Sequence, residues 1–277
     1  MTFAKNAFCA VYKYSGLMRL QERVSSWTGK SFMTIVLFHR VTDDIPEDGL
    51  TVTTRWFRGF CRLVRDRFRA VPLSEIVRYV RGRERPPRRL VAITFDDCYR
   101  DNLFAARVLA EHGLPATFFL PTQAVGTDHV FPWDAGLPRL ANLTWNDVRE
   151  MVSLGHDIGS HTVTHPNMSQ LSDEAARREL TESRRTIEDR TGRTPRFFAY
   201  PFGDGGSFLP RQVSFAQEAG YEACFSGFGG VCHPSMAGPI LPREPVPYFR
   251  SLLNLELHMT GCLDWIYAVK RKAGMLN

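Results

Sequence analysis

Short apolar runs alternate with segments of helical periodicity along most of this 277-residue chain. The apolar runs predict buried strands over residues 34–38, 91–95, 116–120 and 196–200. The segments between them predict helices over residues 54–69, 73–80, 101–112, 144–155 and 172–192. Strands that alternate with helices indicate an α/β fold with a mostly parallel sheet. Because polar residues of interest follow the strands, we expect a barrel-like domain with its functional site at the carboxyl ends of the strands.

The chain has no internal repeat and no low-complexity linker, so one domain with two extensions is expected. We place a helical extension at residues 1–30, the barrel domain at residues 31–260 and a basic tail at residues 261–277. Hydrophobic residues make up 44% of the sequence and charged residues 23%, which excludes disordered, collagen-like and coiled-coil proteins. No stretch reaches the roughly 18–20 uncharged apolar residues that a membrane-spanning helix needs.

The net charge of +6 is concentrated in arginine clusters at residues 62–69 and 81–89 and in the tail at residues 270–272. Such clusters can attract nucleic acid, acidic lipid or an anionic polymer, or can form a solvated surface. No nucleic-acid-binding motif accompanies them, so we expect no nucleic-acid partner. The charge pattern gives no indication of the oligomeric state.

The amino-terminal segment MTFAKNAFCAVYKYSGLMRL has a lysine inside its apolar run and another just after it. That pattern is not typical of a signal peptide, so we expect a cytoplasmic location. The same segment predicts an amphipathic helix that either docks on the domain or lies on a membrane surface. A peripheral membrane contact is therefore among the expectations for this chain.

Six cysteines are scattered through the chain without a Cys-x-x-Cys pair, at positions 9, 61, 98, 224, 232 and 262. This spacing argues against a thiolate zinc site. We expect reduced, mostly buried thiols.

Two adjacent carboxylates, Asp96 and Asp97, follow the predicted strand at residues 91–95. Burying an unpaired carboxylate is strongly unfavourable, so neither is expected to be a passive core residue. Taken alone, the pair is compatible with a metal ligand, a general base or an anchor for nearby arginines.

Two histidines, His161 and His165, lie four residues apart in the segment SHTVTHP. On one helical turn this spacing would place both imidazoles on the same face, where they could bind one metal ion. Thr162 stands where a His-Glu-x-x-His protease has its glutamate, so the base must come from elsewhere, and the aspartate pair can supply it. One carboxylate with two histidines leaves a coordination position open for water, which is typical of catalytic metal sites.

Three motifs in this order resemble those of the polysaccharide deacetylase family, also called the NodB-homology family or carbohydrate esterase family 4. They are Thr94-Phe95-Asp96-Asp97, Gly159-Ser160-His161 with His165, and Ala199-Tyr200-Pro201-Phe202-Gly203. The resemblance extends from about residue 35 to residue 246. The segment Leu37-Phe38-His39-Arg40-Val41 resembles the opening strand of the branch that acts on exopolysaccharides, which has an early histidine.

The resemblance implies a distorted (β/α)7-type barrel and one divalent metal ion, usually zinc. The implied reaction is hydrolysis of an acetyl group, most often the N-acetyl group of an N-acetylhexosamine in an acetylated glycan or glycan-lipid. The implied metal ligands are Asp97, His161 and His165. Asp96 would be the base that takes a proton from the water activated on the metal. The backbone N–H of Phe202, in the motif with Tyr200 and Pro201, would stabilise the oxyanion.

The sequence departs from the family pattern at two positions. Cys98 replaces the glycine that usually follows the aspartate pair, which we interpret as a tolerated variation, with a redox-active or inhibitory thiol as the alternative. Ala199 stands where the third motif usually opens with an arginine. Arg243 is the best substitute for steering the base, and a surface ion pair is the alternative role for it.

The general acid is expected to be a histidine, because its unperturbed pKa near 6.5 suits proton delivery around neutrality. His39 follows the first strand, whereas His258 lies in a segment, residues 252–259, that is equally compatible with a helix. We favour His39, because a residue at the carboxyl end of a barrel strand points into the active-site face.

Two other classes of function are compatible with these residues. One is a different metal-dependent hydrolase or phosphatase, although no Gly-rich phosphate loop is present. The other is a catalytically inactive carbohydrate-binding relative. In the loop after residue 120, Phe131 or Trp133 could stack on a sugar ring or could pack within the loop. We interpret His129 and His156 as structural.

Overall fold

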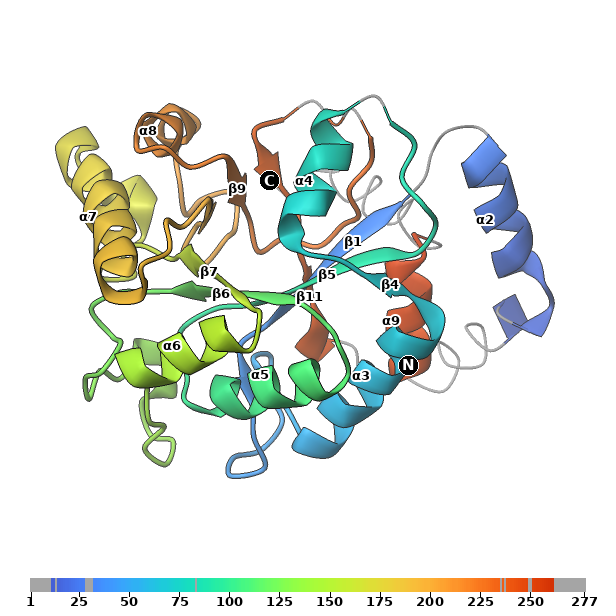
Figure 1. Cartoon of the computed structure of the whole chain (residues 1–277), viewed down its shortest axis with the longest axis horizontal. Helices are drawn as coiled ribbons and strands as arrows, with labels where there is room; N and C mark the ends of the chain where they lie inside the picture. The colour runs from blue at the N-terminus through green and yellow to red at the C-terminus, as the bar shows by residue number, and fades with distance from the viewer. Residues whose placement is uncertain are drawn as a thin grey trace.

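A curved sheet of parallel strands runs through the middle of the molecule, with helices on both of its faces (Figure 1). The computed structural model describes residues 11–12, 14–27, 32–82, 84–234, 236, 238–248 and 251–261. The strands follow the order β10-β9-β8-β7-β6-β5-β1-β11 along the sheet, and β4 also pairs with β5. Their bounds are β1 (Met33–Phe38), β4 (Arg69–Ala70), β5 (Leu90–Phe95), β6 (Ala116–Leu120), β7 (Asp157–Ser160), β8 (Phe197–Ala199), β9 (Ala223–Phe225), β10 (Ile240–Leu241) and β11 (Glu244–Pro245).

All pairings between these strands are parallel. Within the described part of the chain no ladder joins β10 to β11, so the sheet forms an open, distorted barrel. The α/β barrel expected from the sequence is therefore confirmed. A separate pair of short strands, β2 (Arg40–Val41) and β3 (Thr51–Val52), continues the chain beyond the end of β1.

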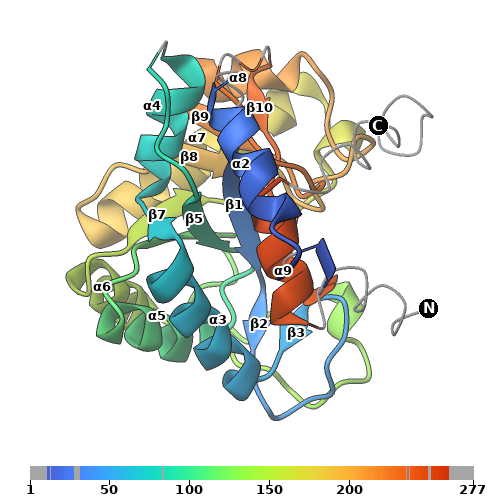
Figure 2. The same cartoon turned by 90° about the vertical axis from the view of Figure 1, so that its right-hand side faces the viewer.

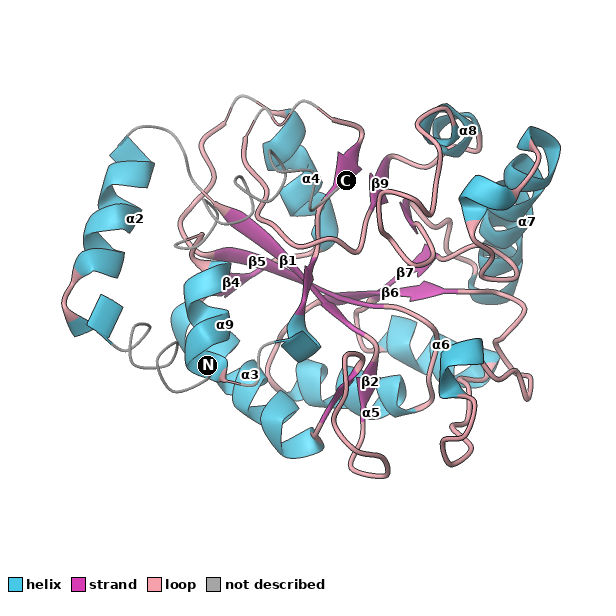
Figure 3. Cartoon of the chain, turned by 180° about the vertical axis from the view of Figure 1, so that it is seen from behind, coloured by secondary structure: helices cyan, strands magenta, loops and turns pink. Residues whose placement is uncertain are grey.

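The helices divide into groups on either side of the sheet. In Figure 1, α3, α5 and α6 lie along one face and α4 lies on the other, while Figure 3 shows β1, β5 and β6 between these layers from behind. The helices are α2 (Leu17–Trp27), α3 (Thr54–Arg67), α4 (Leu73–Arg81), α5 (Asp101–Glu111), α6 (Trp145–Ser153), α7 (Asp173–Thr191), α8 (Gln212–Glu218) and α9 (Leu252–Met259). Short 3-10 turns are η1 (Pro132–Asp134), η2 (Met168–Gln170) and η3 (Val246–Tyr248).

Local capping interactions explain where several helices begin and end. The Thr144 side chain accepts from the backbone N–H of Asp147 while Asp147 accepts from that of Thr144, which completes the predicted capping box of α6. Ser172 caps α7 by accepting from Ala175. The same helix ends at Gly192, whose φ of 67° is the left-handed conformation that glycine adopts without steric cost. The predicted strands and helices all occur, with ends that shift by a few residues. Residues 157–160, which the sequence pattern left unassigned, form β7.

The side chains of the strands alternate between two apolar cores. Val36 and Phe38 of β1 pack with α3, α5 and α6, whereas Met33 and Ile35 pack on the opposite face with α4. Four described cysteines, at positions 61, 98, 224 and 232, are buried free thiols, as expected. Cys9 and Cys262 lie outside the described residues.

The amino-terminal extension contributes α2, which lies beside α9 on the outside of the barrel (Figure 2). Met18 of α2 is buried against Leu257 of α9. The expected boundaries at residues 30 and 260 stay predictions, because residues 28–31 and the basic tail from residue 262 lie outside the described residues. Among the described helices, none is long and apolar enough to cross a bilayer.

Gly159 of β7 offers a test of packing inside the barrel. A Cβ at this position would overlap the ring of Phe119, which is fully buried on the neighbouring strand β6. We expect Gly159→Ala to lower the free energy of unfolding by about 1–3 kcal/mol, as overpacking a core does. Gly238→Ala is the matched control, because a Cβ there would meet open space. Chemical denaturation of both variants measures the difference, and equal stability would contradict this packing.

Candidate active site

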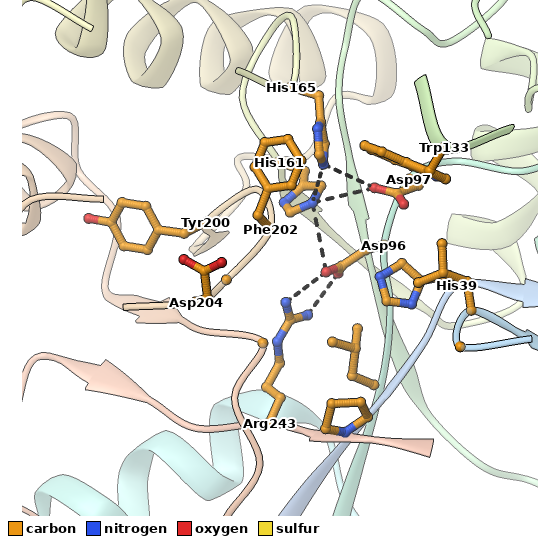
Figure 4. A pocket seen from close by; sticks show the side chains of 16 residues that line it. His39, Asp96, Asp97, Trp133, His161, His165, Tyr200, Phe202, Asp204 and Arg243 are labelled. Atoms are coloured by element: carbon orange, nitrogen blue, oxygen red, sulfur yellow. Dashed lines mark hydrogen bonds and ion pairs between the residues drawn. The ribbon is translucent and has the colours of Figure 1, made fainter. Parts of the chain in front are cut away.

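A pocket of about 360 Å³ opens where the carboxyl ends of the strands meet, and it gathers most of the predicted site residues (Figure 4). His39 follows β1, Asp96 and Asp97 follow β5, and Arg243 lies between β10 and β11. The two histidines at positions 161 and 165 come from the loop after β7. Because parallel strands bring their carboxyl ends to one edge, residues far apart in sequence converge there.

Three potential metal ligands converge on one point at the back of this pocket. The Nε2 atoms of His161 and His165 are 3.2 Å apart. The Oδ1 atom of Asp97 lies 3.5 Å from the first of these nitrogens and 3.2 Å from the second. The three side chains are about nine-tenths buried or more.

The chemistry of these donor atoms fits a cation. His161 directs its Nδ1 at the carbonyl oxygen of Ala199 at 2.8 Å, which assigns the ring proton to Nδ1 and leaves a lone pair on Nε2. The Oδ1 of Asp97 accepts no hydrogen bond from any described residue. Three acceptor atoms that face one another repel unless a proton or a metal ion lies between them. Two imidazoles and one carboxylate are the ligand types that Zn²⁺ binds in open catalytic sites.

Opposing influences set the pKa values of the two aspartates. Burial works to raise the pKa of Asp96, but the charge of Arg243, helped by His161, outweighs burial and holds the pKa below its ordinary value. Burial also works to raise the pKa of Asp97, yet the imidazoles of His161 and His165 hold it well below its ordinary value. Both carboxylates are therefore ionised at neutral pH.

The imidazoles respond in opposite directions. Burial works to lower the pKa of His161, but the charges of Asp96 and Asp97 exceed that effect and raise it. This raised pKa means that the two carboxylates favour a positive charge at this position. Burial lowers the pKa of His39, and the same two carboxylates offset burial only in part. His39 is therefore mostly neutral at pH 7.

The backbone around the ligands is not helical, which corrects one expectation. Thr162 and His165 have φ angles of 72° and 59°, so the His161–His165 segment is a loop with left-handed residues rather than a helical turn. Asp97 and Cys98 also have positive φ, at 73° and 57°. Cys98 thus occupies a conformation that glycine adopts without strain, which agrees with its replacing the glycine of the family pattern.

Arg243 forms a bidentate ion pair with Asp96. Its Nη1 and Nη2 donate to the two carboxylate oxygens, each at 2.7 Å, and its Nε donates to the carbonyl oxygen of Ser226 at 2.8 Å. Both charged side chains are almost fully buried. The alternative of a surface ion pair for Arg243 is therefore wrong. Two parallel hydrogen bonds fix the orientation of the carboxylate as well as its charge.

The two candidate histidines for the general acid lie at different ends of β1. His39 follows the last residue of this strand, and its ring lies beside Asp96 and Asp97 (Figure 4). His258 lies in α9, where the neighbouring carbonyl oxygen of Met259 accepts from Thr34 near the start of the same strand. Five residues separate Thr34 from His39, which is roughly 16 Å of strand. His258 does not line the pocket.

The residues of the third motif, Ala199 to Gly203, differ in how they relate to the pocket. Phe202 lines the pocket with a φ of 63°, and its backbone N–H donates no hydrogen bond to any described residue. The Tyr200 side chain points away from the aspartate–histidine cluster and stacks on Phe208 (Figure 4). Pro201 is buried and does not line the pocket. Gly203 allows the backbone to approach Gly227 so closely that a Cβ would overlap it.

One wall of the pocket depends on a polar network that the sequence pattern did not reveal. The ring of Trp133 lies against His165, and its Nε1 donates to the hydroxyl of Tyr99 at 2.9 Å. That hydroxyl donates to Asp134 at 2.7 Å, and Asp134 is ion-paired with the buried Arg40. No local signal in the sequence connects the network, because Asp134 is 35 residues from Tyr99 and 94 residues from Arg40. The Phe131 ring stacks on Trp133 inside the loop, so only Trp133 lines the pocket.

Comparison with known proteins identifies the family of this chain. The profile of the family described as polysaccharide deacetylase matches residues 83–224, just over half of the chain. The chain belongs to the polysaccharide deacetylase family. A curated relative, the peptidoglycan-N-acetylglucosamine deacetylase of Bacillus cereus, is 28% identical to this deacetylase-family protein over 160 residues, which cover 56% of this chain and 51% of the relative. The matches span between about half and three-fifths of the length of the first curated relatives.

Two solved structures share the fold of this deacetylase-family protein. The Streptococcus pyogenes deacetylase PplD, solved with acetate, superposes with a TM-score of 0.71 at 22% identity and covers 83% of this chain and 99% of its own. IcaB from Ammonifex degensii superposes with a TM-score of 0.66 at 25% identity, covering 77% of this chain and 91% of its own. Both solved structures therefore share the fold of most of this chain.

Metal binding by Asp97, His161 and His165 can be tested directly. The purified protein, dialysed against zinc and then against buffer, is expected to hold about one ion per chain by elemental analysis. His161→Ala and His165→Ala should each remove most of it, because each deletes one of three ligands. His112→Ala is the control and should keep full occupancy, because His112 caps the end of α5 and does not line the pocket. Full occupancy in the double variant of His161 and His165 would exclude this site.

Proposed function

We propose that this protein is a metal-dependent deacetylase that hydrolyses the N-acetyl group of an N-acetylhexosamine in an acetylated glycan or glycan-lipid. One observation carries the proposal: three converging ligand atoms lie beside a buried Asp96–Arg243 ion pair in a single pocket. The relative that acts on peptidoglycan N-acetylglucosamine supports an N-acetylated sugar as the substrate class.

Asp97, His161 and His165 would hold one divalent ion, and zinc is the ion that we propose from their chemistry. Bound there, the ion supplies a Lewis acid that lowers the pKa of a water molecule and polarises the acetyl carbonyl. The chain provides the remaining functions. Asp96 is kept out of the ligand set by its two hydrogen bonds to Arg243.

Asp96 would act as the general base. Its low pKa keeps the carboxylate ionised at neutral pH, so it is ready to accept a proton. The attacking water gives that proton to Asp96 as its oxygen bonds to the acetyl carbon. Arg243 then acts as a positioning residue, because it fixes which oxygen of Asp96 faces the pocket and compensates its charge.

The tetrahedral intermediate is stabilised by a hydrogen-bond donor to its oxyanion, and its breakdown needs an acid that protonates the leaving amine. The unused backbone N–H of Phe202 supports its role as a donor to the oxyanion. The C–N bond then breaks, acetate leaves and the amine nitrogen takes a proton. We propose His39 as the source of this proton, and with it we propose that the protein belongs to the exopolysaccharide-type branch that has an early histidine. Its lowered pKa makes the protonated imidazole a stronger acid, although a smaller fraction is protonated at neutral pH.

Asparagine substitutions separate the roles of the two aspartates. Asp96→Asn is expected to keep its metal and to lose about 10²–10⁴-fold in turnover, because the base is removed while the ligands stay. Asp97→Asn should lose metal as well as activity. Elemental analysis and acetate release from a chitooligosaccharide measure both properties, and Asp189→Asn on the exposed face of α7 is the control. Equal metal loss in the two variants would mean that Asp96 is also a ligand.

Removal of each histidine in turn tests the general acid. We expect His39→Ala to keep its metal but to lose about 10²-fold or more in amide hydrolysis, while His258→Ala stays within a few-fold of the parent. An acetate ester with an activated leaving group needs no acid, so it should restore most of the activity of His39→Ala. In the parent, amide hydrolysis should fall as the pH rises through the pKa of His39, because only the protonated imidazole donates. A dead His258→Ala with a normal His39→Ala would place the acid at the late position.

A further inference from the structure

Most of the large apolar side chains that the described residues expose belong to one short segment. Those in the amino-terminal extension are exposed by 49–79%, namely Val11, Tyr14, Leu17, Leu20 and Val24. Elsewhere in the described residues only Val130 and Phe202 are comparable, and Phe202 lines the pocket. Single exposed apolar residues are ordinary on proteins, but a contiguous group of them marks an interaction surface.

The helix α2 has two apolar faces. Leu17, Leu20 and Val24 are three and seven residues apart, so they lie on one side of the helix. Met18, one position from Leu17, points elsewhere and is buried against Leu257 of α9. One face therefore attaches the helix to the barrel, and the other faces outward, as the position of α2 outside α9 in Figure 2 allows.

The polar positions of α2 carry a net positive charge, with two arginines and one glutamate, Glu22. Arg19 and Arg23 are both exposed to solvent. Residues 1–30 hold five basic side chains and one acidic side chain in the sequence. On the exposed helix α7, three arginines pair with acids, as in Arg178 with Glu174.

A second group of exposed arginines lies at the same edge of the molecule. Arg85 and Arg88 are exposed in the loop before β5, and neither forms an ion pair with a described residue. This loop leads into Leu90, which pairs with Met33 at the start of β1. The end of α2 at Trp27 is six residues from Met33, which is at most about 22 Å of chain. The loop and the helix therefore share the amino-terminal edge of the sheet.

We propose that the outward face of α2, together with Arg85 and Arg88, docks this protein on an anionic lipid bilayer. An apolar stripe of 49–58% exposed side chains flanked by exposed arginines is the pattern of helices that lie in the membrane interface. The apolar side chains enter the boundary between headgroups and acyl chains, and the arginines are attracted by the negative surface potential. The surface does not overlap the pocket, so the proposal is independent of the proposed reaction.

Vesicle sedimentation of the full chain tests this proposal. The parent is expected to bind vesicles that contain one-third phosphatidylglycerol at least about tenfold more tightly than vesicles of phosphatidylcholine alone. Raising the salt concentration to 0.5 M should weaken the binding, because it screens the arginines. Equal binding to both vesicles, or no binding to either, would overturn the proposal.

Paired variants separate the apolar contribution from the charge. Leu17→Ser with Leu20→Ser, and Arg85→Gln with Arg88→Gln, should each weaken binding about tenfold or more. The matched controls are Val130→Ser, also exposed and apolar, and Arg178→Gln with Arg185→Gln on α7, which Figure 1 places on the opposite side from α2. The controls should stay within about twofold of the parent.

Two further readouts keep the result decisive. Circular dichroism and thermal unfolding should match between the parent and all variants, because every substituted side chain is exposed. Light scattering tests whether a second copy of the chain covers the stripe instead. A dimer that the Leu17→Ser and Leu20→Ser pair dissociates, together with vesicle binding equal to that of the parent, would overturn the proposal in favour of self-association.

Discussion

Two buried carboxylates at the end of β5 are the charges around which the pocket is arranged. Asp96 and Asp97 are only 3% and 2% exposed, and ionised groups are stable at such depth only when they are compensated. Arg243 compensates Asp96 through two hydrogen bonds, whereas Asp97 faces the Nε2 atoms of two imidazoles. The charge of Asp96 is thus neutralised by a residue of the chain. The charge of Asp97 is neutralised only by an added positive charge, which makes the group of Asp97 with the two histidines suited to a metal ion.

The backbone that presents these groups is strained, and the surrounding contacts maintain it. Asp97, His165 and Phe202 adopt left-handed conformations, which cost a non-glycine residue on the order of 1 kcal/mol or more each. The loop with His165 is held by Thr162, whose hydroxyl accepts from the His165 N–H at 3.0 Å. Glu179 of α7 accepts from the N–H groups of the two following positions, residues 163 and 164. The helix layer thus contributes to the site through the backbone of the loop.

The two ends of the sheet carry different surface features. The carboxyl ends of the strands carry the pocket, and the amino-terminal edge carries α2 and the arginine-rich loop before β5. About six residues of β1 lie between them, and those residues are fully packed on both faces. Because this buried strand separates them, the pocket and the outward face of α2 can bind different partners. The proposed attachment to a membrane and the proposed hydrolysis in the pocket can therefore be tested by different substitutions.

The sequence by itself determined the elements of the fold and most of the pocket residues. Apolar runs and capping residues are local signals, so they predicted the strands, the α6 capping box and the end of α7 at Gly192. The motifs with Asp97, His161 and His165 predicted which side chains converge. Only the tertiary structure decided the remainder. The histidine spacing suggested a helical turn, but the neighbouring elements impose a left-handed loop. Contacts across the barrel bury the ion pair of Arg243 and place the Asp134 network behind Trp133, because such contacts depend on strand order and leave no periodic trace in the chain.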